Sequence, residues 1–211
     1  MKISLKNELL ELGSFFKRHY HEILVIGLAT LCLALDEYFP ISPQWASALV
    51  YFGILPVSAI IVFLRKNPLD FGFRLGNYKL WGLHVIIFFL VATPILIISS
   101  RYSSLSAYYT IEEFSLLKYT WEIVIYMLAW EFIFRGFMLF GLKEKLGEFS
   151  IFIQMIPFAL LHFGKPEIET ISTILVGIYF GYICYRGNSY WPAVLMHLYI
   201  NIGFRTIVNV F

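Results

Sequence analysis

Charged residues are scarce in this chain. Of its 211 residues, 14% are Asp, Glu, Lys or Arg, whereas 59% are apolar and 19% aromatic. So little polar material cannot give every helix of a water-soluble domain an exposed polar face. The net charge of +2 also lacks the basic excess typical of nucleic-acid binding, and the Lys and Arg residues flank apolar runs instead of forming a stripe. We therefore expect a membrane protein with no nucleic-acid partner.

Cysteine and the common hydrolase motifs are almost absent as well. Cys32 and Cys184 are the only two cysteines, and both stand in apolar stretches, where we expect them to pack as small apolar side chains. The chain has no CxxC pair, phosphate-binding loop or GxSxG serine elbow. His21-Glu22 begins the pattern of a zinc-protease helix but lacks its second histidine. These absences exclude the usual soluble redox and hydrolase templates.

Long apolar runs dominate the chain instead, and several approach the roughly 20 residues that a helix needs to cross a hydrocarbon core. We predict an all-α, polytopic transmembrane helix bundle of about seven to eight spans. The seven spans that we place cover residues 22–38, 45–64, 81–99, 119–142, 150–163, 168–186 and 190–211. Pro157 should bend or break the short fifth span, and the more polar segment 102–117 offers an eighth element.

The first 20 residues differ from the rest. They carry six charged residues, and no small-residue cleavage site follows their first apolar run. Leu5, Leu9, Leu12 and Phe16 recur at helical spacing. This pattern predicts an amphipathic helix over residues 1–20 that lies on the membrane surface. A single transmembrane helical domain over residues 21–211 would follow it.

Basic residues between the predicted spans indicate the orientation of the chain. One set of alternate loops holds eleven of them: Lys2, Lys6, Lys17, Arg18, Arg65, Lys66, Arg74, Lys79, Lys143, Lys145 and Arg186. The opposite set holds four: Arg101, Lys118, Lys165 and Arg205. This asymmetry predicts that the N-terminus is cytoplasmic.

Ionisable side chains recur within three of the predicted spans. Glu131 and Arg135 stand four residues apart, as do His197 and Asn201, and His162 ends a third span. Residues at this spacing share one face of a helix. Charged groups at membrane depth are costly and persist by facing the bundle interior or a wet cavity, where they find partners. We therefore expect a polar site within the bilayer.

Each group taken alone has a structural explanation, because ion pairs and interhelical hydrogen bonds also hold helices together. Taken together, the groups suit the activation of water. Glu131 is placed to remove a proton from water, and His162 to orient that water or move the proton. His197 and Asn201 are suited to receive the developing negative charge. Glu131, His162 and His197 equally suit a three-ligand zinc, although Arg135 beside Glu131 favours a metal-free site.

In their order along the chain, these motifs resemble those of the CPBP intramembrane proteases. That family includes the endopeptidases of prenylated CaaX proteins and proteins of bacteriocin operons, and its pattern is EExxxR, then FxxxH, then HxxxN or HxxxD on separate transmembrane helices. Here residues 131–135 match the first motif from its second glutamate onward, residues 158–162 the second and residues 197–201 the third. The resemblance covers a protease-like core over residues 119–203.

The resemblance implies an intramembrane endopeptidase that hydrolyses a peptide bond of a membrane-associated or lipidated polypeptide. Its partners would be a polypeptide substrate, prenylated or transmembrane, and the lipid bilayer. The stretch between residues 164 and 191 also looks like that of one bacterial branch, which implies a bacterial cell membrane. The residues that the resemblance assigns to catalysis are Glu131, Arg135, His162, His197 and Asn201.

One position departs from the family pattern. The first glutamate of EExxxR, usually assigned as the base that activates water, is Trp130 here. Either Glu131 serves as the base, or Glu169 replaces the missing carboxylate, or the chain keeps the fold without the activity. The alternative function is therefore a non-catalytic membrane scaffold, or an immunity or signalling protein. A transporter ranks last, since inverted repeats are not evident.

Overall fold

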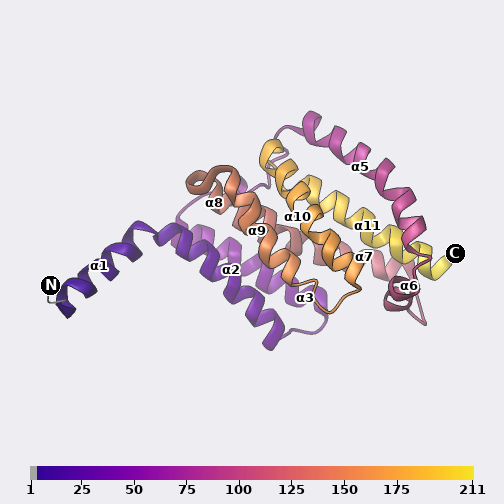
Figure 1. Ribbon diagram of the computed structural model, residues 1–211, viewed down its shortest axis with the longest axis horizontal. Coiled ribbons are helices and arrows are strands. Elements are labelled where there is room, and N and C mark those ends of the chain that lie inside the picture. The colour runs from indigo at the N-terminus through magenta and orange to yellow at the C-terminus, as the bar shows by residue number, and fades with distance from the viewer. Residues whose placement is uncertain (1–3) are drawn as a thin grey trace.

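The computed structural model describes residues 4–211, and in this range every regular element is a helix. The predicted all-α class is confirmed. In chain order the elements are α1 (Leu5–Arg18), α2 (Tyr20–Tyr38), α3 (Gln44–Ala48), η1 (Leu49–Ile54), α4 (Leu55–Ala59), η2 (Ile60–Leu64), η3 (Pro68–Asp70), α5 (Tyr78–Ser99), α6 (Ser103–Tyr109), α7 (Leu116–Glu131), η4 (Phe132–Met138), α8 (Leu139–Leu146), η5 (Gly147–Phe149), α9 (Ser150–Leu160), α10 (Glu167–Gly187) and α11 (Trp191–Val210). Figure 1 shows them gathered into one bundle, from which α1 projects.

Among the described residues, five helical stretches are long and apolar enough to cross a membrane: Gln44–Leu64, α5, Leu116–Leu160, α10 and α11. The pair α1 and α2, bent by 78°, makes a sixth candidate. The predicted seven or eight spans agree roughly with this number. The segment 102–117 forms the short helix α6, and α7 begins at its end, at Leu116.

The stretch Leu116–Leu160 joins two of the predicted spans. Its 45 residues would extend about 68 Å as one straight helix, roughly twice the thickness of a hydrocarbon core. Instead, α9 packs back against α8 and η4. The chain therefore turns near η5, and α7 and α9 run away from that end of the bundle (Figure 1).

The turn after α9 corrects one detail of the sequence prediction. The helix continues through Pro157 and ends at Leu160. His162 therefore lies in the turn between α9 and α10 and not within a membrane-spanning helix.

The N-terminal helix is present where the sequence predicts it, at Leu5–Arg18. None of its residues is buried, and Leu5, Leu9, Leu12 and Phe16 are all exposed. Lys2, which belongs to the predicted segment, lies outside the described residues. The position of α1 on a membrane surface stays a prediction.

The core that supports the site is centred on η4. All seven residues from Phe132 to Met138 are buried. A helical segment buried on every side has no outward face, so it must be surrounded by other helices. Contacts with α2, α4, α7, α8, α9 and α10 provide that enclosure. The π-helical turn of η4 is also a geometry that often occurs at functional sites.

Candidate active site

Glu131 and Arg135 form a completely buried ion pair. Arg135 Nη1 lies 3.0 Å from Glu131 Oε2 and donates a hydrogen bond of 3.3 Å to Oε1. Both side chains are 0% exposed. The pair arises as the sequence predicts, because α7 passes directly into η4 and the four-residue spacing brings the two groups together. A single charge buried here without its partner would cost several kcal/mol.

The imidazole of His197 approaches the same carboxylate from α11. His197 Nδ1 lies 2.5 Å from Glu131 Oε1, although the two residues are 66 positions apart in the chain. Packing of α11 against α7 makes this contact. The structure therefore brings three of the predicted site residues into one continuous network.

Phenylalanine rings enclose the positive end of this network. The guanidinium carbon of Arg135 lies 3.9 Å from the centre of the Phe158 ring, 5.6 Å from that of Phe180 and 5.7 Å from that of Phe134. Such contacts stabilise a desolvated cation. Sequence reasoning missed Phe180, since no motif marks it and only the packing of α10 reveals it.

His162 lies beside this network but is held by its own turn. Its Nδ1 atom is 2.7 Å from the carbonyl oxygen of Phe158, and its side chain is 97% buried. The rings of His162 and His197 lie 4.8 and 6.0 Å from the ring of Phe158, so the two imidazoles share one aromatic neighbour. Of the two imidazoles, that of His197 contacts the carboxylate of Glu131 directly.

A hydroxyl group that the sequence did not single out fixes the turn of His162. Thr170 Oγ1 donates to the carbonyl oxygen of His162 at 2.7 Å. Because Thr170 is in the first turns of α10, this bond ties the turn to the next helix. A threonine near a helix start carries no motif, so only the structure identifies it.

Asn201 stands one turn after His197 but does not contact the carboxylate. Its Nδ2 atom donates to the carbonyl oxygen of His197 at 3.0 Å, and its side chain is only half-buried. The carboxamide has a second N–H that this bond does not use. Asn201 therefore lies at the edge of the site, and the second N–H of its carboxamide can donate a further hydrogen bond.

Trp130 occupies the position of the missing glutamate and packs as an aromatic core residue. Its ring centre lies 5.4 Å from those of Tyr126 and Phe134 and 5.7 Å from that of Phe52. The ring of His162 is 6.3 Å away. An indole N–H is a donor only and cannot accept a proton from water. This position therefore carries no base.

Glu169, the other candidate for the missing carboxylate, belongs to a different cluster. Tyr109 Oη donates to it at 2.7 Å, and Lys165 Nζ lies 2.9 Å from its Oε1 atom. Burial and this neighbouring carboxylate raise the pKa of Tyr109 above its usual range, so its hydroxyl stays a donor. The cluster connects α6 to the start of α10 and leaves Glu169 without a contact to Glu131.

The three candidate zinc ligands do not form a metal site as they are arranged. Between residues 4 and 211, no three His, Cys, Asp or Glu side chains gather in a way that would hold a metal ion. Glu131 Oε1 accepts a hydrogen bond from His197 Nδ1, and Oε2 forms an ion pair with Arg135. As they are arranged, these residues therefore do not fit a zinc ion.

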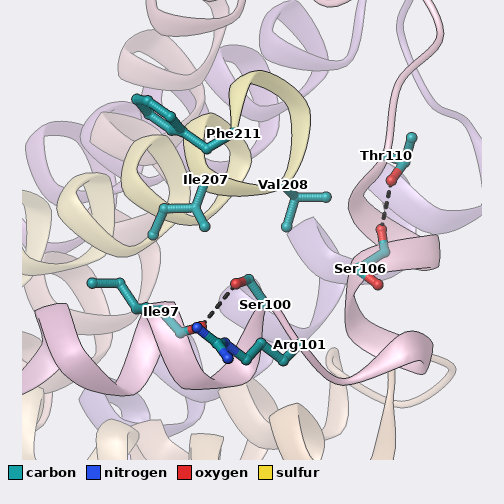
Figure 2. A pocket seen from close by; sticks show the side chains of 8 residues that line it. All are labelled: Ile97, Ser100, Arg101, Ser106, Thr110, Ile207, Val208 and Phe211. Atoms are coloured by element: carbon teal, nitrogen blue, oxygen red, sulfur yellow. Dashed lines mark hydrogen bonds between the residues drawn. The ribbon is translucent and has the colours of Figure 1, made fainter.

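A separate pocket lies away from this network, between the ends of α5, α6 and α11 (Figure 2). Its lining consists of Ile97, Ser100, Arg101, Ser106, Thr110, Ile207, Val208 and Phe211. None of the five predicted site residues lines it. The candidate active site is thus a packed network and not this open pocket.

Comparison with known proteins finds a family resemblance over the segment that contains these residues. Residues 112–203 match the family model Rce1-like, described as type II CAAX prenyl endopeptidase Rce1-like. The search of curated proteins and the search of solved structures each found no match. The matched segment includes Glu131, Arg135, His162, His197 and Asn201. The protein is an integral, multi-pass membrane protein, and its segment 112–203 resembles the type II CAAX prenyl endopeptidases of the Rce1-like family.

Proposed function

We propose that this protein is an intramembrane endopeptidase that hydrolyses a peptide bond of a membrane-associated or lipidated polypeptide. The observation that carries the proposal is the buried network of Glu131, Arg135 and His197, which lies within the Rce1-like segment. Buried ionic groups in a membrane bundle are expensive and mark functional sites. The family match supports a CAAX-type protease.

Peptide hydrolysis requires an activated water, a donor for the oxyanion and a proton for the leaving nitrogen. The imidazoles of His162 and His197 suit the proton transfers, and the free N–H of Asn201 suits the oxyanion. Arg135 Nε and Nη2 and Trp130 Nε1 are buried without a hydrogen-bond partner among the described residues. Buried polar atoms of this kind usually bind ordered water. The network therefore has hydrogen-bonding capacity that the described side chains do not use.

The substrate in this proposal reaches the site from the bilayer. The helices that carry Glu131 and His197, α7 and α11, lie in stretches apolar enough to span the membrane. A polypeptide with a prenyl group or a transmembrane segment would be concentrated at that depth. We further propose a bacterial cell membrane with the N-terminus on the cytoplasmic side, as the distribution of basic residues indicates.

Cleavage assays in proteoliposomes test this function. The substrates are a farnesylated CaaX peptide, the same peptide without the farnesyl group, and a peptide with a transmembrane segment. We expect the wild type to cleave at least one of them, and Glu131→Gln and His197→Ala to lose at least about 100-fold in kcat, the effect of removing a positioned acid–base group. His84→Gln, in the lipid-facing helix α5, is the matched control. Unchanged cleavage by both site variants would remove these residues from the mechanism.

A scaffold that keeps the protease fold is the second candidate, and the observation that favours it is Trp130. A position occupied by the base in the family holds a buried aromatic side chain here. A scaffold would keep its biological effect in the Glu131→Gln variant, provided that the variant still inserts and folds. A peptidase would lose it.

A further inference from the structure

Glu131 is poorly placed to take a proton from water. Its side chain is wholly enclosed, with Oε1 at 2.5 Å from His197 Nδ1 and Oε2 at 3.0 Å from Arg135 Nη1. Oε1 therefore accepts hydrogen bonds from both His197 and Arg135, while Oε2 lies against the guanidinium without a hydrogen bond, and neither oxygen is exposed. A general base must come within hydrogen-bond reach of the water that it deprotonates. Complete burial keeps both oxygens of Glu131 away from a water molecule outside the network.

The same contact fixes the proton on His197. The guanidinium of Arg135 stays protonated under all ordinary conditions, so its buried partner Glu131 is the ionised form. A carboxylate only accepts hydrogen bonds, so the short contact from Nδ1 places the proton of the imidazole on Nδ1. The second ring nitrogen, Nε2, then carries a lone pair. It is a proton acceptor.

His197 is also the member of this network that solvent can reach. Its side chain is 11% exposed, whereas those of Glu131 and Arg135 are 0% exposed. A water molecule can therefore approach the imidazole without displacing the ion pair.

His162 lacks the electrostatic support that His197 has. Its Nδ1 atom faces a neutral carbonyl oxygen, that of Phe158. The charged side chains that act on it, Lys165 and Glu169, are paired with each other at 2.9 Å. His197 Nδ1 instead contacts the carboxylate of Glu131 directly, as the base of a catalytic triad contacts its orienting acid. Of the two imidazoles, His197 is the one that a carboxylate orients.

We propose that His197 Nε2 is the general base of the peptidase and that Glu131 is its positioning residue. The inference rests on the proposed peptidase function and assigns the proton transfers within it. It also accounts for a site that works with Trp130 in place of a glutamate, because an imidazole backed by a carboxylate supplies the base that this position lacks. The arrangement follows the general logic of a base oriented by a third group.

The reaction then proceeds in two balanced steps. One O–H bond of water breaks, its proton moves to His197 Nε2, and the oxygen forms a bond to the scissile carbonyl carbon while the carbonyl electron pair moves onto its oxygen. As this intermediate collapses, the C–N bond breaks and the imidazolium returns the proton to the leaving nitrogen. One peptide and one water yield a carboxyl terminus and an amine, and His197 regains its starting state.

The variant His197→Gln separates a base from a mere hydrogen-bond donor. Glutamine keeps an N–H near the position of Nε2, but it cannot accept and return a proton. We expect kcat to fall by about 10²–10⁴-fold with little change in KM, as for the loss of a general base. His84→Gln, the same exchange on α5, should leave kcat unchanged. Retention of most of the activity by His197→Gln would show that His197 only donates a hydrogen bond, and would overturn the inference.

A spectroscopic measurement tests the role of Glu131 without a substrate. In protein labelled with ¹⁵N-histidine and reconstituted in lipid nanodiscs, we expect His197 to carry its proton on Nδ1 and to have a bare Nε2. The Nδ1 proton should resonate far downfield, as in a short hydrogen bond to a carboxylate, and should move upfield in Glu131→Gln. A resonance that places the proton on Nε2 would overturn the inference.

These outcomes distinguish the inference from the function on which it rests. A wild-type protein that cleaves none of the three substrates overturns both. A wild-type protein that cleaves a substrate, but has the proton of His197 on Nε2 or tolerates His197→Gln, keeps the peptidase function and overturns the assignment of His197 as base.

Discussion

Two helical stretches of this protein differ in how their hydropathy relates to their burial within the protein. The lipid-facing helix α5 has the higher mean hydropathy, yet only 17% of its most apolar window is buried within the protein. The stretch Leu116–Leu160 is less apolar, and 72% of its window is buried. In a water-soluble protein the more apolar helix would be the buried one. Here the surroundings are themselves apolar, so the polar groups gather inside.

The difference also explains where a charged site can form. Lipid offers no partner to a polar side chain, so Glu131 and Arg135 must satisfy one another within the bundle. An ion pair of the same spacing joins Asp70 and Arg74 at the protein surface, where both side chains are more than half exposed. The two pairs have similar separations but very different environments. Together they allow the effect of burial on the strength of an ion pair to be tested at the same spacing along the chain.

Replacement of each arginine should give the largest contrast between the two pairs. Arg135→Met leaves the Glu131 charge buried without its partner, and we expect a loss of about 3–5 kcal/mol in the free energy of unfolding. Arg74→Met removes an exposed pair and should cost less than about 1 kcal/mol. Unfolding in mixed detergent micelles, followed by circular dichroism, measures both. Equal stability of the two variants would mean that burial does not determine the strength of the pair.

A smaller contrast is expected between apolar residues inside the bundle and those on its lipid face. Phe137 is fully buried, whereas Leu90 of α5 is 70% exposed. In a bilayer the unfolded helices remain in lipid, so truncation loses packing contacts but little transfer energy. We therefore expect Phe137→Ala to cost roughly 2 kcal/mol, below the 3–5 kcal/mol of soluble cores, and Leu90→Ala less than about 0.5 kcal/mol. The same micelle titration measures both, and a larger loss for Leu90→Ala would contradict this view of α5.

Contacts within one helix were predictable from the sequence, and contacts between helices were not. The pairing of Glu131 with Arg135 follows from their four-residue spacing. The contact between Glu131 and His197 depends on how α11 packs against α7, which no local pattern specifies. The order of the motifs indicated that these groups belong to one site. It did not indicate that the carboxylate of Glu131 would be completely buried and would hold the imidazole of His197 through Nδ1.

The boundaries of the spans were predicted less well for a physical reason. Hydropathy identifies apolar residues, but it does not show whether lipid or protein surrounds them. The predicted spans 119–142 and 150–163 therefore correspond to one helical stretch that turns back on itself near η5. His162 was expected at the end of a span, and it lies just beyond one because α9 ends at Leu160.

The smallest effect is expected at Trp130, although it occupies the position of a family glutamate. Trp130→Phe loses some ring contacts with Tyr126 and Phe52, but it also removes a buried N–H that has no partner among the described residues. These two changes oppose one another, so we expect the free energy of unfolding to shift by less than about 1 kcal/mol. The cleavage rate should stay within about twofold of the wild type, since His197 and not this position transfers the proton. Trp121→Phe, at an exposed tryptophan of the same helix, is the matched control. A large loss of kcat in Trp130→Phe alone, with stability unchanged, would contradict this expectation. It would assign the indole N–H to the binding of substrate. The buried face of α7 would then supply both the carboxylate of Glu131 and a hydrogen-bond donor for the substrate.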